Sequence, residues 1–238
     1  MRLTHEEIRL FRHNGFLKLK DRLPEETVGR LKEAIWKDIQ AEVEPVVRDR
    51  EGRVVRLSNL LDRDPVFQEV LTGPTVLDPL ESLLGPNIVM IKNRHNHATL
   101  RTASVNSDKL HRDMLQWTRD IVTVLFYLEE STLEKGCTQV IPGTHVLPWS
   151  DGLYNIVKED WVQQSGILDQ TVPVPMPAGG LLVIDSMILH GAGQNTTSET
   201  RISMTAGYHS VDELAETPSP KVHLARGQFI YKGNDNYN

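Results

Sequence analysis

The sequence predicts a single α+β domain whose strands form a sandwich or a closed barrel. The first third carries helical periodicity and capping signals, whereas short segments rich in β-branched residues follow from Asn87 onward. No internal repeat, low-complexity segment or linker divides the 238 residues. Helices followed by a run of strands are typical of α+β architecture. We therefore expect one domain over residues 1–238, with a helical part at 1–86, a strand core at 87–210 and a tail at 211–238.

The helical part contains recognisable helix boundaries. Thr4 and Glu7 fit a capping box, and Asn14-Gly15 is typical of the end of a short helix. The following GFLKLKD alternates apolar and polar residues, as one strand does. Pro24 begins a longer helix. Its expected buried stripe consists of Val28, Leu31, Ile35 and Ile39.

The rest of this part is less regular. Residues 44–60 are charged and without a clear period, so we expect a loop there. Two short helical segments follow, DPVFQEVLTG and PTVLDPLESLLG, each closed by a glycine.

The strand core contains six short apolar segments. They are NIVMIKN, DIVTVLFYLEE, TQVIPG, TVPVPM, GGLLVID and RISMTAGYHS. Residues 149–170 break this rhythm with aromatic and acidic side chains, and we interpret them as a lid or an inserted loop.

Composition excludes several classes of protein. Hydrophobic residues make up 39% and charged residues 24%, as in ordinary globular proteins. The net charge of −6, with no stripe of Lys or Arg, argues against nucleic acid as a partner. The one cysteine, Cys137, excludes an internal disulfide and a zinc site built from cysteines. The first residues, MRLTHEEIRLF, are unlike a signal peptide and no stretch could cross a bilayer, so we expect a cytoplasmic location without membrane contact.

The stretch KLHRDMLQW raises the question of what His111-Arg112-Asp113 does. A kinase catalytic loop needs an asparagine where this chain has Thr118, and no Asp-Phe-Gly follows, so that class is excluded. In extended backbone, His111 and Asp113 project to one face while Arg112 points away. A surface ion pair is the simpler alternative.

A downstream histidine and arginine favour a metal site. His190 follows a buried apolar strand, and Arg201 comes eleven residues later, where a hairpin would return it to the same cavity. Two histidines and one aspartate form the facial triad that suits non-haem Fe(II) and leaves positions open. The planar fork of an arginine binds the carboxylate of a dicarboxylate co-substrate through two hydrogen bonds.

These motifs together resemble the phytanoyl-CoA dioxygenase family of Fe(II)/2-oxoglutarate-dependent dioxygenases. GCTQVIPGTH is similar to the family's stretch before the lid, and HGAGQN to its distal-histidine turn. The resemblance covers roughly residues 85–210, and the N-terminal helices more loosely. It implies a double-stranded β-helix, a distorted cupin-like jelly roll with helices packed on one side.

The resemblance also implies roles for individual residues. His111, Asp113 and His190 would be the catalytic iron ligands, Arg201 would bind the C5 carboxylate of 2-oxoglutarate, and Thr138 would contact the same co-substrate. The chain departs from some relatives at two further positions: Ala192 stands where they carry a serine, and Lys109 where they place another polar residue before the first histidine.

The implied activity is hydroxylation of an unactivated C–H bond. Fe(II) would be the cofactor, 2-oxoglutarate and O2 would be consumed, and succinate and CO2 would be released. Halogenating relatives replace the carboxylate ligand with a small residue, so Asp113 favours hydroxylation, desaturation or cyclisation. No basic cluster suits a CoA phosphate, and we expect a small-molecule substrate, as in secondary metabolism and natural-product biosynthesis. Residues 94–107 and 149–170 are expected to select it. The sequence does not indicate an oligomeric state.

Other residues are weaker candidates. Lys92 and Asn93 end a strand and are expected to face the cavity, near the co-substrate. Trp117 and Trp149 are candidates for lining the substrate pocket, and His145 either touches substrate or caps the Pro142-Gly143 turn.

Two alternatives stay open for the whole protein. A cupin-like metal-binding isomerase would share the barrel and the histidines without needing Arg201, and a non-catalytic binding protein would keep the barrel alone. His95, His97 and His209 are not expected to be ligands, because the triad is complete without them.

Overall fold

The computed structural model describes residues 1–92, 94–103, 105, 107–114, 121–148, 150–211 and 221–229. Within these residues no helix has both the length and the apolar character needed to cross a membrane.

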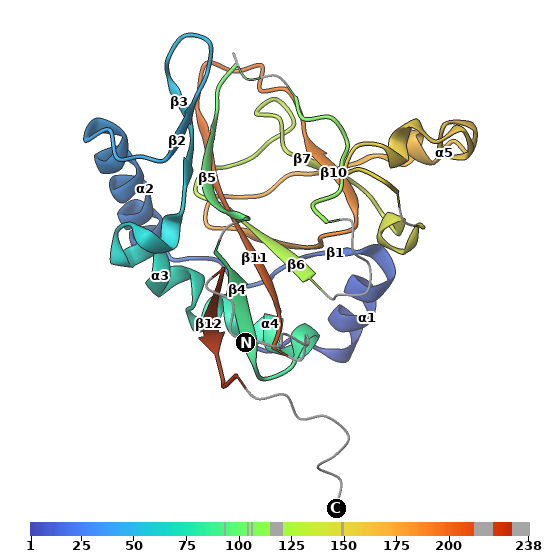
Figure 1. The fold of residues 1–238 in the computed structure, drawn as a ribbon, viewed down its shortest axis with the longest axis horizontal. Coiled ribbons are helices and arrows are strands. Elements are labelled where there is room, and N and C mark those ends of the chain that lie inside the picture. The colour runs from blue at the N-terminus through green and yellow to red at the C-terminus, as the bar shows by residue number, and fades with distance from the viewer. Residues whose placement is uncertain are drawn as a thin grey trace, which may run out of the picture.

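Two antiparallel sheets form the centre of the molecule (Figure 1). The large sheet has the order β1-β9-β6-β11-β5-β3-β2, with β4 paired to β11 and β12 paired to β4; the small sheet has the order β10-β7-β8. The strands of the large sheet are β1 (Phe16–Lys18), β2 (Val46–Arg48), β3 (Val54–Ser58), β4 (Ile88–Ile91), β5 (Asn96–Arg101), β6 (Ile121–Tyr127), β9 (Leu181–Asp185), β11 (Arg201–Ser210) and β12 (Val222–Arg226). Those of the small sheet are β7 (Thr138–Ile141), β8 (Val172–Val174) and β10 (Leu189–Ala192).

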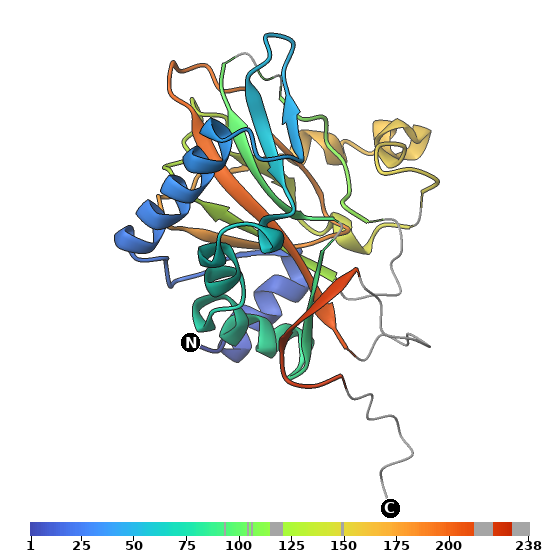
Figure 2. The same cartoon turned by 60° about the vertical axis from the view of Figure 1, so that its left-hand side comes forward.

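Helices cover the outer face of the large sheet (Figure 2). They are α1 (His5–Asn14), α2 (Glu25–Gln40), α3 (Pro65–Leu71) and α4 (Pro74–Leu84), with a short 3-10 turn at Leu60–Asp62. Beyond the small sheet lie α5 (Asp160–Gln164) and 3-10 turns at Thr144–Val146, Ile156–Lys158 and Ile167–Gln170. The expected α+β jelly roll with helices on one side is confirmed.

Strand alternation separates the core from a cavity. In β11, Ile202 and Met204 pack in the core that the helices share, while Arg201 and Ser203 point between the two sheets. The same period of two holds in β6, where Val124 joins the helix-side core. The inner face of the large sheet is therefore free to carry polar side chains.

The expected helix boundaries are confirmed. The Thr4 side chain accepts from the Glu7 amide, and the Glu7 carboxylate accepts from the Thr4 amide at 2.8 Å, which completes the capping box. Gly15 ends α1 with a φ of 79°, where a Cβ would also meet the His145 ring. In α2 the predicted stripe is buried at Val28, Leu31 and Ile35 and partly buried at Ile39.

The expected loop at residues 44–60 is wrong. β2 and β3 form an antiparallel hairpin there, and β3 continues the large sheet by pairing with β5. Charged residues hid the alternation, because this hairpin lies at the sheet edge with much of its surface in solvent. The tail expected from 211 onward also contains β12, which pairs with β4.

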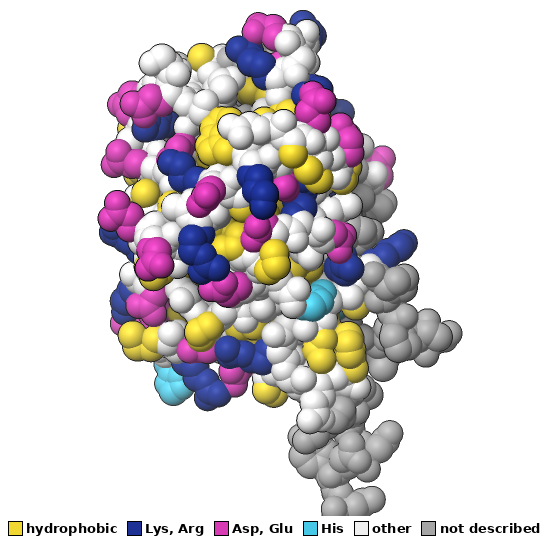
Figure 3. Space-filling model, turned by 90° about the vertical axis from the view of Figure 1, so that its left-hand side faces the viewer, with side chains coloured by type: hydrophobic (Ala, Val, Ile, Leu, Met, Phe, Trp, Pro, Cys, Tyr) yellow, Lys and Arg dark blue, Asp and Glu magenta, His cyan; other side chains and the backbone are white. Residues whose placement is uncertain are grey.

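Acidic and basic side chains are interspersed on the helix-covered face (Figure 3). One of its ion pairs joins Arg30 of α2 to Glu69 of α3, with nitrogen and oxygen 2.6 Å apart. Mixed charge of this kind is typical of a solvated surface.

Candidate active site

The segment that carries His111 and Asp113 lies against β10. His111 and His190 exchange both backbone hydrogen bonds, at 2.9 and 3.0 Å, and the Asp113 amide donates to the Ser186 carbonyl. This extended pairing directs the side chains of His111 and Asp113 to the same side. Arg112 points away, as expected, and its guanidinium donates to three carbonyls in residues 144–148.

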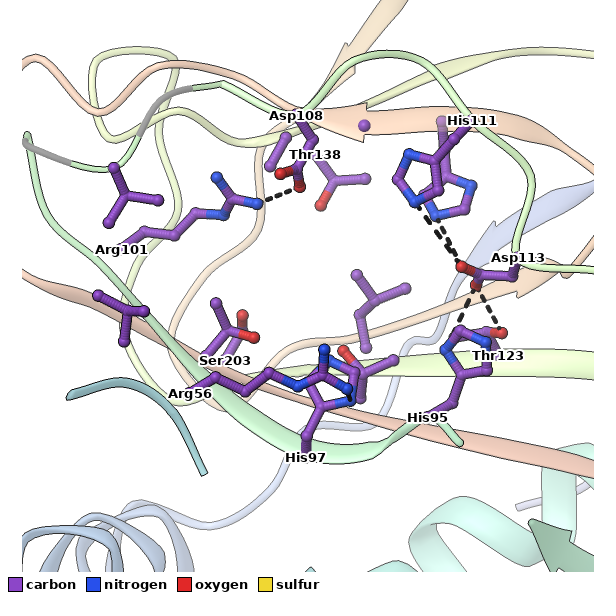
Figure 4. A pocket seen from close by; sticks show the side chains of 18 of the residues that line it. Arg56, His95, His97, Arg101, Asp108, His111, Asp113, Thr123, Thr138 and Ser203 are labelled. Atoms are coloured by element: carbon purple, nitrogen blue, oxygen red, sulfur yellow. Dashed lines mark hydrogen bonds and ion pairs between the residues drawn. The ribbon is translucent and has the colours of Figure 1, made fainter. Parts of the chain in front are cut away.

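Three predicted ligands converge at one end of the cavity (Figure 4). Asp113 Oδ1 lies 3.8 Å from His111 Nε2 and 3.6 Å from His190 Nε2. One ligand atom from each of the three residues lies within 4.8 Å of the other two. Among the described residues no other histidine, cysteine or acidic residue joins such a cluster.

The tautomers of both histidines fit metal binding. His111 Nδ1 lies 2.8 Å from the Lys109 carbonyl oxygen, and His190 Nδ1 lies 3.0 Å from the Ile188 carbonyl oxygen. Because a carbonyl only accepts, each Nδ1 carries a proton, so that in the neutral ring each Nε2 presents a lone pair. Burial, and then His190, lower the pKa of His111, which keeps this ring neutral.

Asp113 is held as an oriented carboxylate. Its Oδ2 accepts from the Thr123 hydroxyl at 3.0 Å, and that hydroxyl also lies 2.9 Å from Ser186 Oγ. Burial raises the pKa of Asp113, but positive charge on the nearby histidines when they are protonated, His190 first, and the Thr123 hydrogen bond bring it below its ordinary value. Two neutral imidazoles and one carboxylate are the donor set of a divalent-metal site with open positions.

The cavity beside this cluster has a volume of about 490 Å³ and lies between the two sheets. Arg201, 2% exposed, reaches it from the first position of β11. Its Nη1 donates to Ser131 Oγ at 3.0 Å, whereas its buried Nε has no hydrogen-bond partner. An unpaired buried guanidinium nitrogen is costly, so this site is suited to an anionic ligand.

Thr138 lines the same cavity from β7. Its hydroxyl lies 2.6 Å from the hydroxyl of Tyr127, whose pKa burial raises to about 12. Tyr127 is therefore a neutral, fully buried residue that positions Thr138. The roles of Tyr127 and Ser131 were not predicted, because each acts through a residue from another part of the chain.

Other predicted residues do not meet at the site. Lys92 does not line the cavity, and its Nζ lies 3.4 Å from Asp62. His145 lies against α1 instead, where its Nε2 is 3.1 Å from the Arg12 carbonyl oxygen. Asn93, Trp117 and Trp149 lie outside the described residues.

Several further polar residues line the cavity. Arg94, His95, His97 and Arg101 lie in the range 94–107 that was expected to select the substrate, whereas Arg56 on β3 was not predicted. His95 Nδ1 lies 3.8 Å from Asp113 Oδ2, beside the cluster rather than within it. Alternation along residues 96–101 could have placed His97, Thr99 and Arg101 on one face, but this short strand follows a polar stretch that resembles a loop.

The expected lid or insertion at 149–170 is, over residues 150–170, a helical excursion that covers the outside of the small sheet. Ile156 and Val162 pack against Ile141 and Leu189 of that sheet. From the start of the excursion Tyr154 reaches the cavity, with its ring centroid 5.3 Å from that of His111.

Sequence comparisons place this architecture among known proteins. The human peroxisomal phytanoyl-CoA dioxygenase is 25% identical over 244 residues, which cover 88% of this chain and 69% of that protein. Dioxygenase af480 of Aspergillus fumigatus is 27% identical over 209 residues. That match covers 77% of this chain and 63% of the Aspergillus protein.

Solved structures share the fold at low sequence identity. EctD from S. alaskensis, with 2-oxoglutarate and 5-hydroxyectoine, superposes with a TM-score of 0.77 at 18% identity, covering 91% of this chain and 79% of that one. The carbocyclase SnoK from nogalamycin biosynthesis has a TM-score of 0.72 at 17% identity, covering 88% and 85%. The family model for phytanoyl-CoA dioxygenase (PhyH) matches residues 11–203. The chain therefore belongs to the phytanoyl-CoA dioxygenase (PhyH) family, which confirms the iron- and 2-oxoglutarate-dependent dioxygenase class expected from its motifs.

Proposed function

We propose that this protein hydroxylates an unactivated C–H bond of a small metabolite, as in natural-product biosynthesis, using Fe(II), 2-oxoglutarate and O2. One observation carries the proposal: the Nε2 atoms of His111 and His190 and the carboxylate of Asp113 converge on a cavity that also receives the buried Arg201. Family membership supports the class of reaction.

His111, Asp113 and His190 would hold Fe(II) on one side and leave the cavity side open. Their orientation does not depend on the metal, since the Lys109 and Ile188 carbonyls fix the two rings. The chain thus presents a site organised before the metal binds, which favours affinity.

Arg201 would bind the C5 carboxylate of 2-oxoglutarate. Arg201 donates to Ser131 through Nη1, so its Nε is free to donate to a ligand. Thr138 lines the same cavity. Burial of Arg201 strengthens such charge-assisted hydrogen bonds, because little water competes for the guanidinium.

When bound, iron and 2-oxoglutarate supply an oxidising equivalent: 2-oxoglutarate and O2 become succinate and CO2, and one oxygen atom enters the substrate C–H bond. The chain contributes the rest by binding and orientation. Asp113 occupies the ligand position that a halide would need, so hydroxylation is favoured over halogenation.

Related proteins support a small-molecule substrate without selecting one. The matched relatives and structures include a phytanoyl-CoA dioxygenase, a protein with bound 5-hydroxyectoine and a carbocyclase. A cavity of about 490 Å³ falls in the usual range for small ligands.

Succinate release tests the proposal. Protein loaded anaerobically with Fe(II) and then given O2 and 2-oxoglutarate should form succinate, faster with an accepted substrate. Arg201→Lys should raise the 2-oxoglutarate concentration at half-maximal rate by about tenfold or more, since Lys loses the bidentate geometry.

Lys135→Gln, which removes an ion pair with the exposed Glu199 outside the cavity lining, is the matched control and should leave that concentration unchanged. A folded, iron-loaded protein that forms no succinate would instead favour a cupin-like isomerase or a binding protein.

A further inference from the structure

Arg56 and His97 form a pair on the inner face of the large sheet, away from the candidate iron ligands (Figure 4). β3 and β5 are neighbouring antiparallel strands, and this pairing brings Arg56 Nη2 to 3.0 Å from His97 Nδ1. Both side chains line the cavity, along the wall opposite Asp108 and His111 in Figure 4.

The hydrogen bond between them fixes what they offer to a ligand. A guanidinium can only donate, so His97 Nδ1 must accept and the proton of the neutral ring must sit on Nε2. Burial, with Arg56 as the next cause, lowers the pKa of His97 to about 3, in agreement with a neutral ring. The pair therefore presents N–H donors to the cavity and no acceptor.

Arg56 has no carboxylate partner among the described residues. Its Nη2 donates to the neutral His97 ring, and its buried Nε has no hydrogen-bond partner. Because a partly buried cation without a counter-charge is unfavourable, the protein keeps this arrangement at a cost in stability.

The other charges of the cavity already have partners or roles. Arg101 pairs with Asp108, and Arg94 donates to the Asp113 carbonyl oxygen. Under the proposed function, Arg201 takes the co-substrate. Among the described residues, Arg56 is then the cavity arginine that has neither a carboxylate nor a carbonyl partner and no role in binding the co-substrate.

Neighbouring hydroxyls extend the donor set. In the sheet register Arg56 lies opposite Thr99, which in turn lies opposite Ser203, and both line the cavity. A row of guanidinium, imidazole N–H and two hydroxyls matches a small anion with several acceptor oxygens.

We propose that the primary substrate carries an anionic group, a carboxylate or a phosphate monoester, which binds Arg56 and His97 while the C–H bond to be oxidised faces the iron ligands. This inference rests on the proposed function only in taking the cavity as the substrate site. It makes Arg56 a residue that determines substrate specificity.

Ligand-observed ¹⁹F NMR can test the anion site. The probes are 4-fluorophenylacetate, its neutral amide and 4-fluorobenzyl phosphate, each titrated into anaerobic protein saturated with Fe(II) and 2-oxoglutarate. We expect an acid to bind about tenfold or more tightly than the amide, because a charge-assisted pair is lost in the amide. If 4-fluorophenylacetate binds more tightly than 4-fluorobenzyl phosphate, the site prefers a carboxylate; the opposite order indicates a phosphate site.

Variants assign the preference to this pair. Arg56→Gln should abolish the preference for the acid, and Arg56→Lys should keep part of it. Arg48→Gln is the matched control, since Arg48 lies on the same hairpin, outside the cavity lining, near Glu42. His97→Gln should weaken acid binding while leaving the amide unchanged.

The proposal is overturned if acid and amide bind alike, if neither acid binds at millimolar concentration, or if Arg56→Gln keeps the preference. Repeating the titration without Fe(II) and 2-oxoglutarate separates this outcome from failure of the proposed function. An Arg56-dependent preference in that titration would support the anion site even if the protein did not bind 2-oxoglutarate.

Discussion

Asp113 connects the metal cluster to the fold. Its Oδ1 faces both His111 and His190, while its Oδ2 accepts from Thr123 on β6. The backbone amide of Asp113 is tied to Ser186. Asp113 thus connects the His111 segment to the turn before β10 and to β6 of the large sheet. Removing its carboxylate should disturb metal binding more than it disturbs folding.

Asp113→Ala should abolish succinate release and weaken Fe(II) binding by more than 100-fold, because the change removes the only anionic donor of the cluster. Thr123→Val is a milder companion and should cost about 10- to 100-fold in affinity, the usual range for a residue that orients a ligand. Metal affinity can be measured by anaerobic calorimetry. Normal hydroxylation by folded Asp113→Ala would mean that the ligand assignment is wrong.

At the scale of single elements, Arg112 organises the chain between β7 and the helical excursion. It is fully buried and donates to the carbonyl oxygens of Thr144, Leu147 and Pro148, at 2.9 to 3.2 Å. The Thr144 hydroxyl in turn accepts from the amide of Leu189, next to His190. The residue between two predicted ligands is therefore a structural anchor.

Arg112→Met should lower the free energy of unfolding by about 3 kcal/mol or more, because it leaves three carbonyls without donors and such bonds contribute about 1.5–3 kcal/mol each. Urea unfolding of the metal-free protein measures this. Arg112→Lys keeps the charge but loses the planar guanidinium, so its free energy of unfolding should lie between those of the wild type and Arg112→Met. An unchanged denaturation midpoint for Arg112→Met would remove Arg112 from this role.

The capping box of α1 predicts a pH-dependent contribution to stability. The Lys20 ammonium, followed by the Thr4 amide, lowers the pKa of Glu7 from 4.5 to about 2. A carboxylate with a lowered pKa stabilises the folded state above its unfolded pKa, and this contribution fades as the pH falls from 4.5 toward 2.

The stability difference between the wild type and Glu7→Gln should therefore be largest near neutral pH and shrink on acidification. Its size should be at most about 1 kcal/mol, because the Lys20 partner is well exposed to solvent. Urea midpoints at a series of pH values measure it. A difference that stays constant through the acid range would contradict the assigned cause.

Local signals predicted the helices that end in caps and the apolar strands, and missed strands rich in polar or charged residues. Thr4, Glu7 and Gly15 define α1 within a few residues of chain, so the sequence alone sufficed. β3 pairs with β2 and β5, and β5 pairs with β3 and β11, so these polar segments become strands through partners that are mostly distant along the chain. For this reason the charged pattern at residues 44–60 predicts a loop although a hairpin forms there.

At the scale of the whole molecule, polar side chains that line the cavity alternate with core residues along β5 and β11. His111, Asp113, His190 and Arg201 could be predicted because their order and spacing are read along the chain. Arg56 could not, since its relation to His97 depends on the register of a hairpin that charged residues concealed. Of the pair proposed to select the substrate, Arg56 was thus not predicted, whereas His97 lies in the range 94–107 that was expected to do so.

The central claim is that His111, Asp113 and His190 bind one ferrous ion and that Arg201 anchors 2-oxoglutarate beside it. Anaerobic titration of the protein with Fe(II) and then 2-oxoglutarate, followed by visible absorption, tests it most directly. The account predicts a weak metal-to-ligand charge-transfer band that saturates with 2-oxoglutarate and is lost in His190→Ala. Folded protein that binds iron yet develops no such band would contradict it.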